Sequence, residues 1–144
     1  MTAVHVVGAT GYAAAELVRL LDAHPDVRIA TLESSSSAGK RMCDLFPALP
    51  AIENVLAPSG AVRERVRPAD VVFLAGNHEV AHEHAPGLLA AGARVIDLSD
   101  AYGTDIRDSD SFIVYSMYGY VAPVGEGQAQ IAASRASSGN RAAM

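Results

Sequence analysis

Four short apolar segments constrain the fold of this chain more than any other feature. They span residues 3–8, 27–32, 70–76 and 93–99, and each is rich in valine, isoleucine or leucine with little polar alternation. Strands that are covered on both faces have this continuous apolar character, and such strands are typical of parallel sheets. The pattern therefore predicts a buried parallel sheet.

Helical patterns separate these segments. Residues 12–24 repeat apolar side chains at the spacing of one helix face and end at His24-Pro25, and residues 78–91 form a second pattern that Gly92 ends. Because strands and helices alternate, we expect an α/β fold with a doubly wound parallel sheet of Rossmann type and right-handed crossovers.

The last part of the chain differs in composition. From Val121 onward it is rich in alanine, serine, glycine and glutamine and has no sustained apolar period. We therefore expect a folded domain over residues 1–120 and a flexible or divergent tail over residues 121–144.

Charge and cysteine content exclude several classes of protein. The net charge of the 144 residues is −5, which argues against a nucleic-acid partner. The sequence contains no basic leader and no apolar run long enough for a membrane helix, so no membrane association is expected. Cys43 is the single cysteine, so an intrachain disulfide is impossible and a cytoplasmic location is expected.

The turn after the first apolar segment is rich in glycine. Gly8-Ala9-Thr10-Gly11 joins the first predicted strand to the first predicted helix, and Ala14 supplies a third small residue. Glycines in this setting let the backbone approach a pyrophosphate that lies on the helix N-terminus. The turn predicts a dinucleotide site, and an ordinary strand–helix turn without a ligand is the alternative.

Four serines follow the second predicted strand. An acidic residue at that strand end bonds the ribose 2′-hydroxyl of NAD in many dinucleotide-binding domains, and Glu33 stands roughly there. Ser34–Ser37, with Lys40 and Arg41 close behind, instead suit the charged 2′-phosphate of NADP. We predict NADP, with Glu33 directed away from the ribose; a solvated serine loop is the alternative.

A second motif points to different chemistry. His78-Glu79-Val80-Ala81-His82 fits the H-E-x-x-H pattern of zinc hydrolases, with His84 nearby. However, the motif begins where a buried strand ends, and His84 follows His82 too closely to share its helix face. We therefore expect no metal site and interpret Glu79 as a favourable charge in the first turn of a helix.

Several of these stretches together resemble one enzyme family. GATGYAAAELVRLLDAHPDV, SSSSAGKRMCDLFPAL and DVVFLAGNHEVAHEHAPGLLAAGARVIDLS occur in the order found in N-acetyl-gamma-glutamyl-phosphate reductases, which act in arginine biosynthesis. The resemblance covers roughly residues 3–100. It implies an NADP-binding Rossmann domain from an oxidoreductase that reduces an acyl phosphate to a semialdehyde, in a cytoplasmic enzyme whose full-length form is a homo-oligomer.

The resemblance also implies which residues contact the cofactor. The pyrophosphate would lie on Gly8, Thr10, Gly11, Tyr12 and Ala13. The adenosine phosphate would meet Ser34, Ser35, Ser36, Ser37, Gly39 and Lys40. Ala75, Gly76 and Ser99 would face the nicotinamide.

The chain departs from the family pattern at several positions. Ala14 and Ala15 stand where the family usually has glycines, and the segments 76–79 and 100–103 also differ from it. The family's catalytic cysteine lies in a Pro-Gly-Cys-Tyr-Pro-like segment that these 144 residues do not contain, and Cys43 lies on the adenosine side. We therefore expect that these residues include no catalytic residue and no substrate domain, and that the chain is inactive alone. A natural stop, a frameshift near residues 105–120 or a cloned fragment would each produce such a chain.

Other interpretations remain at this point. A short-chain dehydrogenase needs a tyrosine four residues before its lysine, and Ser36 stands there relative to Lys40, which excludes an active enzyme of that class. Aspartate-semialdehyde dehydrogenases share the fold and a similar Ser-Ala-Gly-Lys stretch. A non-catalytic NADP-binding module is the further alternative.

Overall fold

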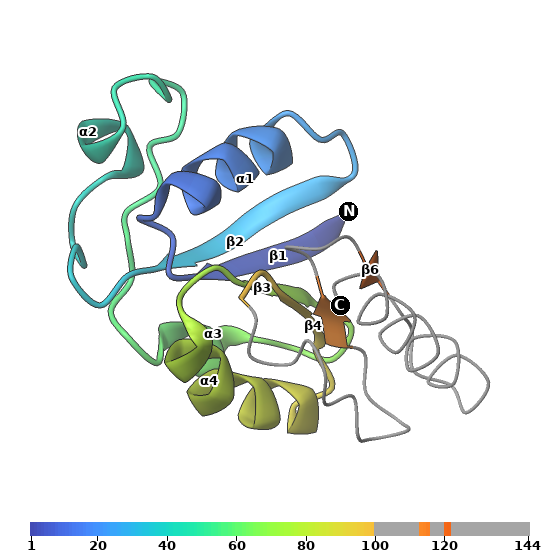
Figure 1. Cartoon of the computed structure of the whole chain (residues 1–144). Coiled ribbons are helices and arrows are strands. Elements are labelled where there is room, and N and C mark those ends of the chain that lie inside the picture. Colours follow the sequence, from blue (N-terminus) through green and yellow to red (C-terminus); the bar gives the residue numbers. More distant parts are fainter. Residues whose placement is uncertain (100–112, 116–119, 122–144) are drawn as a thin grey trace, which may run out of the picture.

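The computed structural model describes residues 1–99, 113–115 and 120–121 of the chain. Within these residues one six-stranded sheet has the order β2-β1-β3-β4-β5-β6 (Figure 1). The strands are β1 (Thr2–Val7), β2 (Val27–Glu33), β3 (Val71–Leu74), β4 (Arg94–Asp97), β5 (Ile113–Tyr115) and β6 (Tyr120–Val121). Neighbouring strands from β2 to β5 are parallel, and β6 pairs antiparallel with β5.

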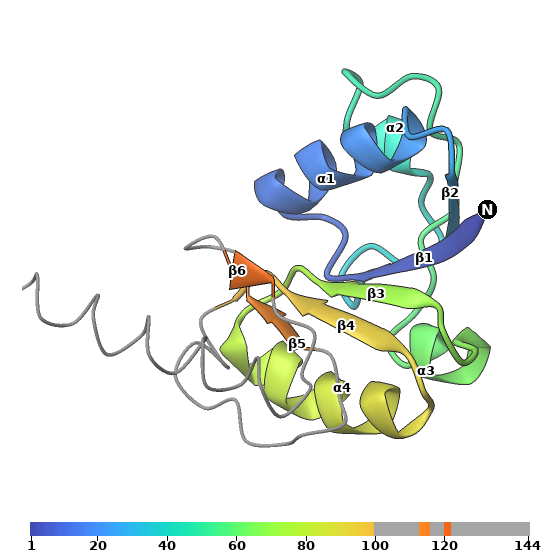
Figure 2. The ribbon, with the colours of Figure 1, turned by 90° about the vertical axis from the view of Figure 1, so that its right-hand side faces the viewer.

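Helices cover both faces of this sheet. They are α1 (Tyr12–Asp22), α2 (Met42–Leu45), α3 (Ala61–Arg65) and α4 (His78–Ala90). Helices α1 and α2 lie on one face, while α3 and α4 lie on the other (Figures 1 and 2). The predicted α/β fold with a doubly wound parallel sheet is confirmed.

Each face of the sheet has its own hydrophobic core. On the α1 side, Val4 and Val6 of β1 pack with Val18 of α1, Leu32 of β2 and Met42 of α2. On the other side, the core contains Val7, Val62, Val72, Leu74, Ala81, Ala85, Leu88, Ala93 and Val95. Because β1 and β3 are covered on both faces, their sequences are continuously apolar, as the parallel-sheet interpretation requires.

The segment between β2 and β3 is more structured than the sequence indicated. It holds α2 and α3, helices of four and five residues, which the sequence analysis did not predict. Such short helices show no readable period and depend on tertiary packing. Leu49, Ile52 and Leu56 of this segment are buried in the core under α1, and this burial holds the segment against the sheet.

The predicted element boundaries need small corrections. The strands predicted over 70–76 and 93–99 form ladders only over Val71–Leu74 and Arg94–Asp97, so Ala75, Gly76 and Ser99 lie in turns just beyond them. The first helix ends at Asp22. The predicted tail over 121–144 lies outside the described residues except for Val121. No helix in the described part of the chain is long and apolar enough to span a membrane.

Candidate functional site

The turns after β1 and β3 meet where the strand order of the sheet reverses. β1 has β2 on one side and β3 on the other, so the chain winds outward in both directions from this pair. In open α/β sheets, ligands bind beyond the carboxyl ends of the strands at such a switch point. Several predicted cofactor residues follow the ends of β1, β2, β3 and β4, and they therefore lie along this one edge.

Gly8 and Gly76 bring the two central turns into direct contact. Gly8 has a φ of +80°, and a Cβ atom built on it would lie 2.8 Å from the main-chain nitrogen of Gly76. Only glycine accommodates both this conformation and this approach. The Ala75 N–H donates to the Val7 carbonyl at 2.8 Å and fixes the second turn beside the first.

The glycine-rich turn is also tied to the end of β2. The main-chain N–H groups of Gly8 and Ala9 both donate to the carbonyl oxygen of Glu33, at 3.0 and 2.9 Å. Ala9 is fully buried beneath the turn. The backbone that would approach a pyrophosphate is therefore fixed by β2 as well as by β3.

Helix α1 begins with main-chain N–H groups for which the described residues supply no acceptor. Gly11 is its N-cap, no side chain caps it within the described residues, and its first turn holds no acidic residue. The N–H groups of Tyr12, Ala13 and Ala14 precede the first helical hydrogen bond, in which the Ala15 N–H donates to the Gly11 carbonyl at 2.9 Å. A Cβ on Gly11 would meet nothing within 4 Å, and Tyr12 is 93% exposed. This arrangement suits an anion placed close to the backbone.

The serine loop, residues 34–40, is organised around Ser34. That side chain is buried, and its hydroxyl accepts the Ser37 N–H at 3.2 Å and lies 3.3 Å from the Thr10 hydroxyl. The Ser34 N–H donates to the Ala57 carbonyl at 3.0 Å. Ser34 thus joins the loop to the glycine-rich turn, a role that the sequence analysis did not assign to it.

The outer part of the serine loop is open to solvent. Ser35, Ser36, Gly39 and Lys40 are exposed, and Ser37 is half-buried. Gly39 has a φ of +83°, and its N–H donates to the Leu56 carbonyl at 2.8 Å, which closes the base of the loop. Lys40 makes no ion pair with any described residue, so its ammonium group is available to an anion.

Arg41 is engaged differently from Lys40. Its guanidinium donates twice to the Asp44 carboxylate, at 3.0 and 2.8 Å. These bonds raise the pKa of Arg41 and lower the pKa of Asp44. Both side chains are half-exposed. Of the two cations noted in the sequence, Lys40 is therefore the one without an ion pair among the described residues.

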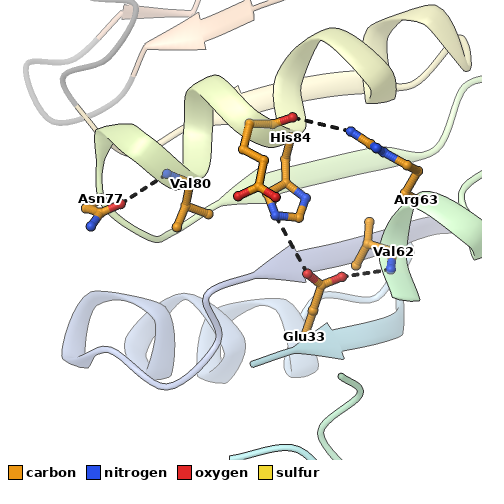
Figure 3. A network of polar contacts seen from close by, with 7 residues as sticks. Glu33, Val62, Arg63, Asn77, Val80 and His84 are labelled. Carbon is orange, nitrogen blue, oxygen red and sulfur yellow. Dashed lines mark hydrogen bonds and ion pairs between the residues drawn. The ribbon is translucent and has the colours of Figure 1, made fainter. Parts of the chain in front are cut away.

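The Glu33 carboxylate lies inside the protein, on the α3–α4 side of the sheet (Figure 3). One of its oxygens accepts the main-chain N–H of Val62 at 2.8 Å, and the other lies 4.0 Å from Nε2 of His84. Glu33 is only 2% exposed. The carboxylate is thus held in the interior by contacts with α3 and α4, and that Glu33 is directed away from a bound ribose stays a prediction.

The ends of β3 and β4 complete the edge. The Asn77 side chain caps α4 by accepting the Val80 N–H at 3.0 Å (Figure 3). Beyond β4, the buried Asp97 carboxylate accepts the main-chain N–H of Ser99 at 2.8 Å and its hydroxyl at 2.9 Å. Asp97 is not among the residues predicted from the sequence, although an aspartate two residues before a serine at a strand end is a known turn signal.

Two further features of the sequence remain, the histidines of α4 and Cys43. His78, Glu79 and His82 are exposed on α4, whereas His84 is buried beside Glu33. No group of three metal-ligating side chains gathers among the described residues, so the H-E-x-x-H pattern gains no geometric support.

Helix α2, which contains Cys43, lies on the far side of the molecule from β4 (Figures 1 and 2). Cys43 is therefore distant from the predicted nicotinamide side.

Comparison with protein families gives one match over most of the chain. The family described as "Semialdehyde dehydrogenase, NAD binding domain" matches residues 3–123. Several curated relatives are named N-acetyl-gamma-glutamyl-phosphate reductase. The one from Halorhodospira halophila is 43% identical over 83% of this chain and 33% of the relative. The one from Azotobacter vinelandii is 48% identical over 69% of this chain and 29% of the relative. The Escherichia coli reductase is 42% identical over 80% of this chain and 34% of the relative. The chain thus spans about a third of the length of the curated relatives it matches.

Solved structures give the same fold. Aspartate semialdehyde dehydrogenase with NADP from Candida albicans matches with a TM-score of 0.58 and 26% identity, covering 76% of this chain and 32% of that one. A probable aspartate-semialdehyde dehydrogenase from Pseudomonas aeruginosa matches with a TM-score of 0.55 and 35% identity, covering 69% of this chain and 28% of that one.

Proposed function

The chain belongs to the semialdehyde dehydrogenase family, whose NAD-binding domain it contains, and on this premise we propose that it is the NADP-binding part of an N-acetyl-gamma-glutamyl-phosphate reductase. The reaction of the whole enzyme is the NADPH-dependent reduction of an acyl phosphate to a semialdehyde. When bound, the dinucleotide supplies the hydride for that reduction.

The position of Glu33 is the observation that carries the choice of NADP. Its carboxylate is bound to the Val62 N–H in the interior, while Ser35, Ser36 and Lys40 stand exposed at the same strand end. Recognition of a ribose 2′-hydroxyl uses an acidic acceptor at this place, whereas a 2′-phosphate needs donors and a positive charge. The exposed groups of the serine loop are hydroxyl donors and an ammonium group, which suit a 2′-phosphate.

The other residues of the edge fit the rest of the dinucleotide. The pyrophosphate would contact the turn from Gly8 to Gly11 and the first N–H groups of α1. Gly11, Tyr12 and Ala13 are exposed there, and no described side chain caps the helix. Ala75, Gly76 and Ser99 follow β3 and β4, the strands farther from the serine loop, and would border the nicotinamide. Asp97 would hold the Ser99 hydroxyl in place.

The reductase is preferred over an aspartate-semialdehyde dehydrogenase because of sequence similarity. The relatives named as reductases are 42–48% identical to this chain, whereas the solved aspartate enzymes of Candida albicans and Pseudomonas aeruginosa are 26% and 35% identical. We further propose a cytoplasmic location and a homo-oligomeric full-length form, which cell fractionation and light scattering would test.

Calorimetric titration of the 144-residue protein with NADPH and with NADH tests the cofactor assignment. We expect NADPH to bind at least about tenfold more tightly, which corresponds to about 1.4 kcal/mol. Equal affinities would contradict the assignment to NADP, and the absence of binding to either cofactor would contradict the dinucleotide site itself.

A second assay separates binding from turnover. The same 144 residues should not catalyse phosphate-dependent oxidation of N-acetylglutamate semialdehyde, because Cys43 lies far from the nicotinamide side. Measurable turnover that a Cys43→Ser substitution abolishes would show that Cys43 is the reactive thiol and would overturn this placement.

A further inference from the structure

We propose that His84 keeps the Glu33 carboxylate in the interior and so strengthens the preference for NADP over NAD without contacting the cofactor. This inference rests on the proposed function. It makes His84 a positioning residue for cofactor specificity, acting through Glu33.

Glu33 stands next to both parts of the predicted cofactor site. Its carbonyl oxygen accepts the N–H groups of Gly8 and Ala9 in the pyrophosphate turn, and the serine loop begins at the following residue. A 2′-phosphate carries nearly two negative charges, as a phosphoryl monoester does near neutral pH. A Glu33 carboxylate that turned toward the loop would repel this phosphate and would accept a hydrogen bond from a ribose 2′-hydroxyl instead.

Two groups keep the carboxylate on the α3–α4 side of the sheet (Figure 3). The Val62 N–H binds one oxygen at 2.8 Å, and Nε2 of His84 lies 4.0 Å from the other. The Glu33 and His84 side chains are 2% and 8% exposed, so water contributes little to the solvation of this carboxylate. Loss of the His84 ring would leave one buried oxygen without its neighbouring polar group, which favours rotation of the side chain toward the polar serine loop.

His84 has no other described polar contact that would explain its burial. Its Nδ1 atom is buried without a hydrogen-bond partner among the described residues. Its neighbours in the helix, Ala81 and Ala85, belong to the apolar core. The approach of Nε2 to Glu33 is therefore the interaction that distinguishes histidine from an apolar residue at this position.

A double-mutant cycle tests the inference on the 144-residue protein. His84→Leu removes the polar ring at similar volume, Glu33→Gln removes the charge but keeps an acceptor for the Val62 N–H, and the double variant carries both changes. We expect His84→Leu to lower the ratio of NADPH to NADH affinity by about three- to tenfold, in the usual range for coupled neighbours. Glu33→Gln should keep the wild-type ratio, and the double variant should regain it because no charge remains to repel the phosphate.

The outcomes separate this inference from the proposed function. A wild-type protein that does not prefer NADPH would overturn the NADP assignment, whatever the variants do. If the wild type prefers NADPH and His84→Leu leaves this preference unchanged, only the role of His84 is overturned. The same holds if His84→Leu lowers the preference and the double variant does not restore it. His82→Leu makes the same change on the exposed face of α4 and should not move the ratio. If circular dichroism shows that the His84→Leu variant does not fold, the His84→Asn variant is used instead. The asparagine side chain is too short to approach Glu33, so we expect the same fall in the affinity ratio.

Discussion

At the residue scale, Gly8 and Gly11 flank one turn but are needed for different reasons. Gly8 combines a φ of +80° with an approach to Gly76 that leaves no space for a Cβ atom. Gly11 has an extended conformation and open space around its Cβ position. The first glycine therefore serves the fold, and the second serves the proposed ligand.

Gly8→Ala should destabilise the protein itself. The methyl group would meet main-chain atoms of Ala75 and Gly76 at 2.8–3.1 Å, and backbone atoms cannot move aside as a flexible side chain does. Because this clash adds to the strain of a left-handed backbone conformation, we expect the free energy of unfolding to fall by about 2 kcal/mol or more. Urea denaturation measures this, and a loss below about 0.5 kcal/mol would show that the two turns are not packed as described.

Gly11→Ala should separate binding from stability. Alanine at an N-cap costs about 1 kcal/mol or less relative to glycine, so the protein should remain folded. Its methyl group would occupy the space through which a pyrophosphate approaches the start of α1, and NADPH affinity should fall at least about tenfold, or about 1.4 kcal/mol. Unchanged affinity in calorimetry would place the pyrophosphate elsewhere.

At the scale of elements, the serine loop has a fixed base and an open outer part. Ser34 is buried and bonds within the loop, while Gly39 and Lys40 pair through their main chains with Leu56. These contacts present Ser35, Ser36 and the Lys40 ammonium at the end of β2 without need of a ligand. A phosphate bound there would therefore meet a loop that is largely preorganised, which lowers the entropic cost of binding.

Lys40→Met should weaken NADPH binding selectively. It removes the positive charge from the outer part of the loop and keeps much of the side-chain length, so the NADPH dissociation constant should rise about tenfold while that of NADH stays the same. The matched control is Arg41→Met, because the Arg41 guanidinium is already bound to Asp44. Equal losses from the two substitutions, or an equal loss for both cofactors, would contradict a specific contact between Lys40 and the 2′-phosphate.

At the scale of the whole molecule, local sequence was sufficient for the parallel sheet but not for its internal contacts. Continuous apolar strands and amphipathic helices are periodic features, and they predicted β1 to β4, α1 and α4. The glycine pair Gly8–Gly11 was readable because the turn chemistry is local. Its contact with Gly76 was not, because it depends on how β3 pairs with β1.

The same limit explains what was missed around Glu33. The serine run indicated that this acid is not the ribose acceptor, but nothing near residue 33 identifies Val62 or His84 as its partners. Both come from distant parts of the chain, and only the packing of α3 and α4 on one face of the sheet brings them together. Helix α3 itself is too short to leave a periodic signal.

The central claim is that the serine loop binds a 2′-phosphate while the start of α1 binds the pyrophosphate. Amide chemical shifts of the ¹⁵N-labelled protein, followed during titration with 2′,5′-ADP and separately with 5′-ADP, test it most directly. We expect 2′,5′-ADP to shift the amides of Ser35, Ser36, Gly39 and Lys40, and 5′-ADP to shift mainly those of Gly11, Tyr12 and Ala13. Identical shift patterns for the two ligands, or a serine loop that responds to neither, would contradict the claim.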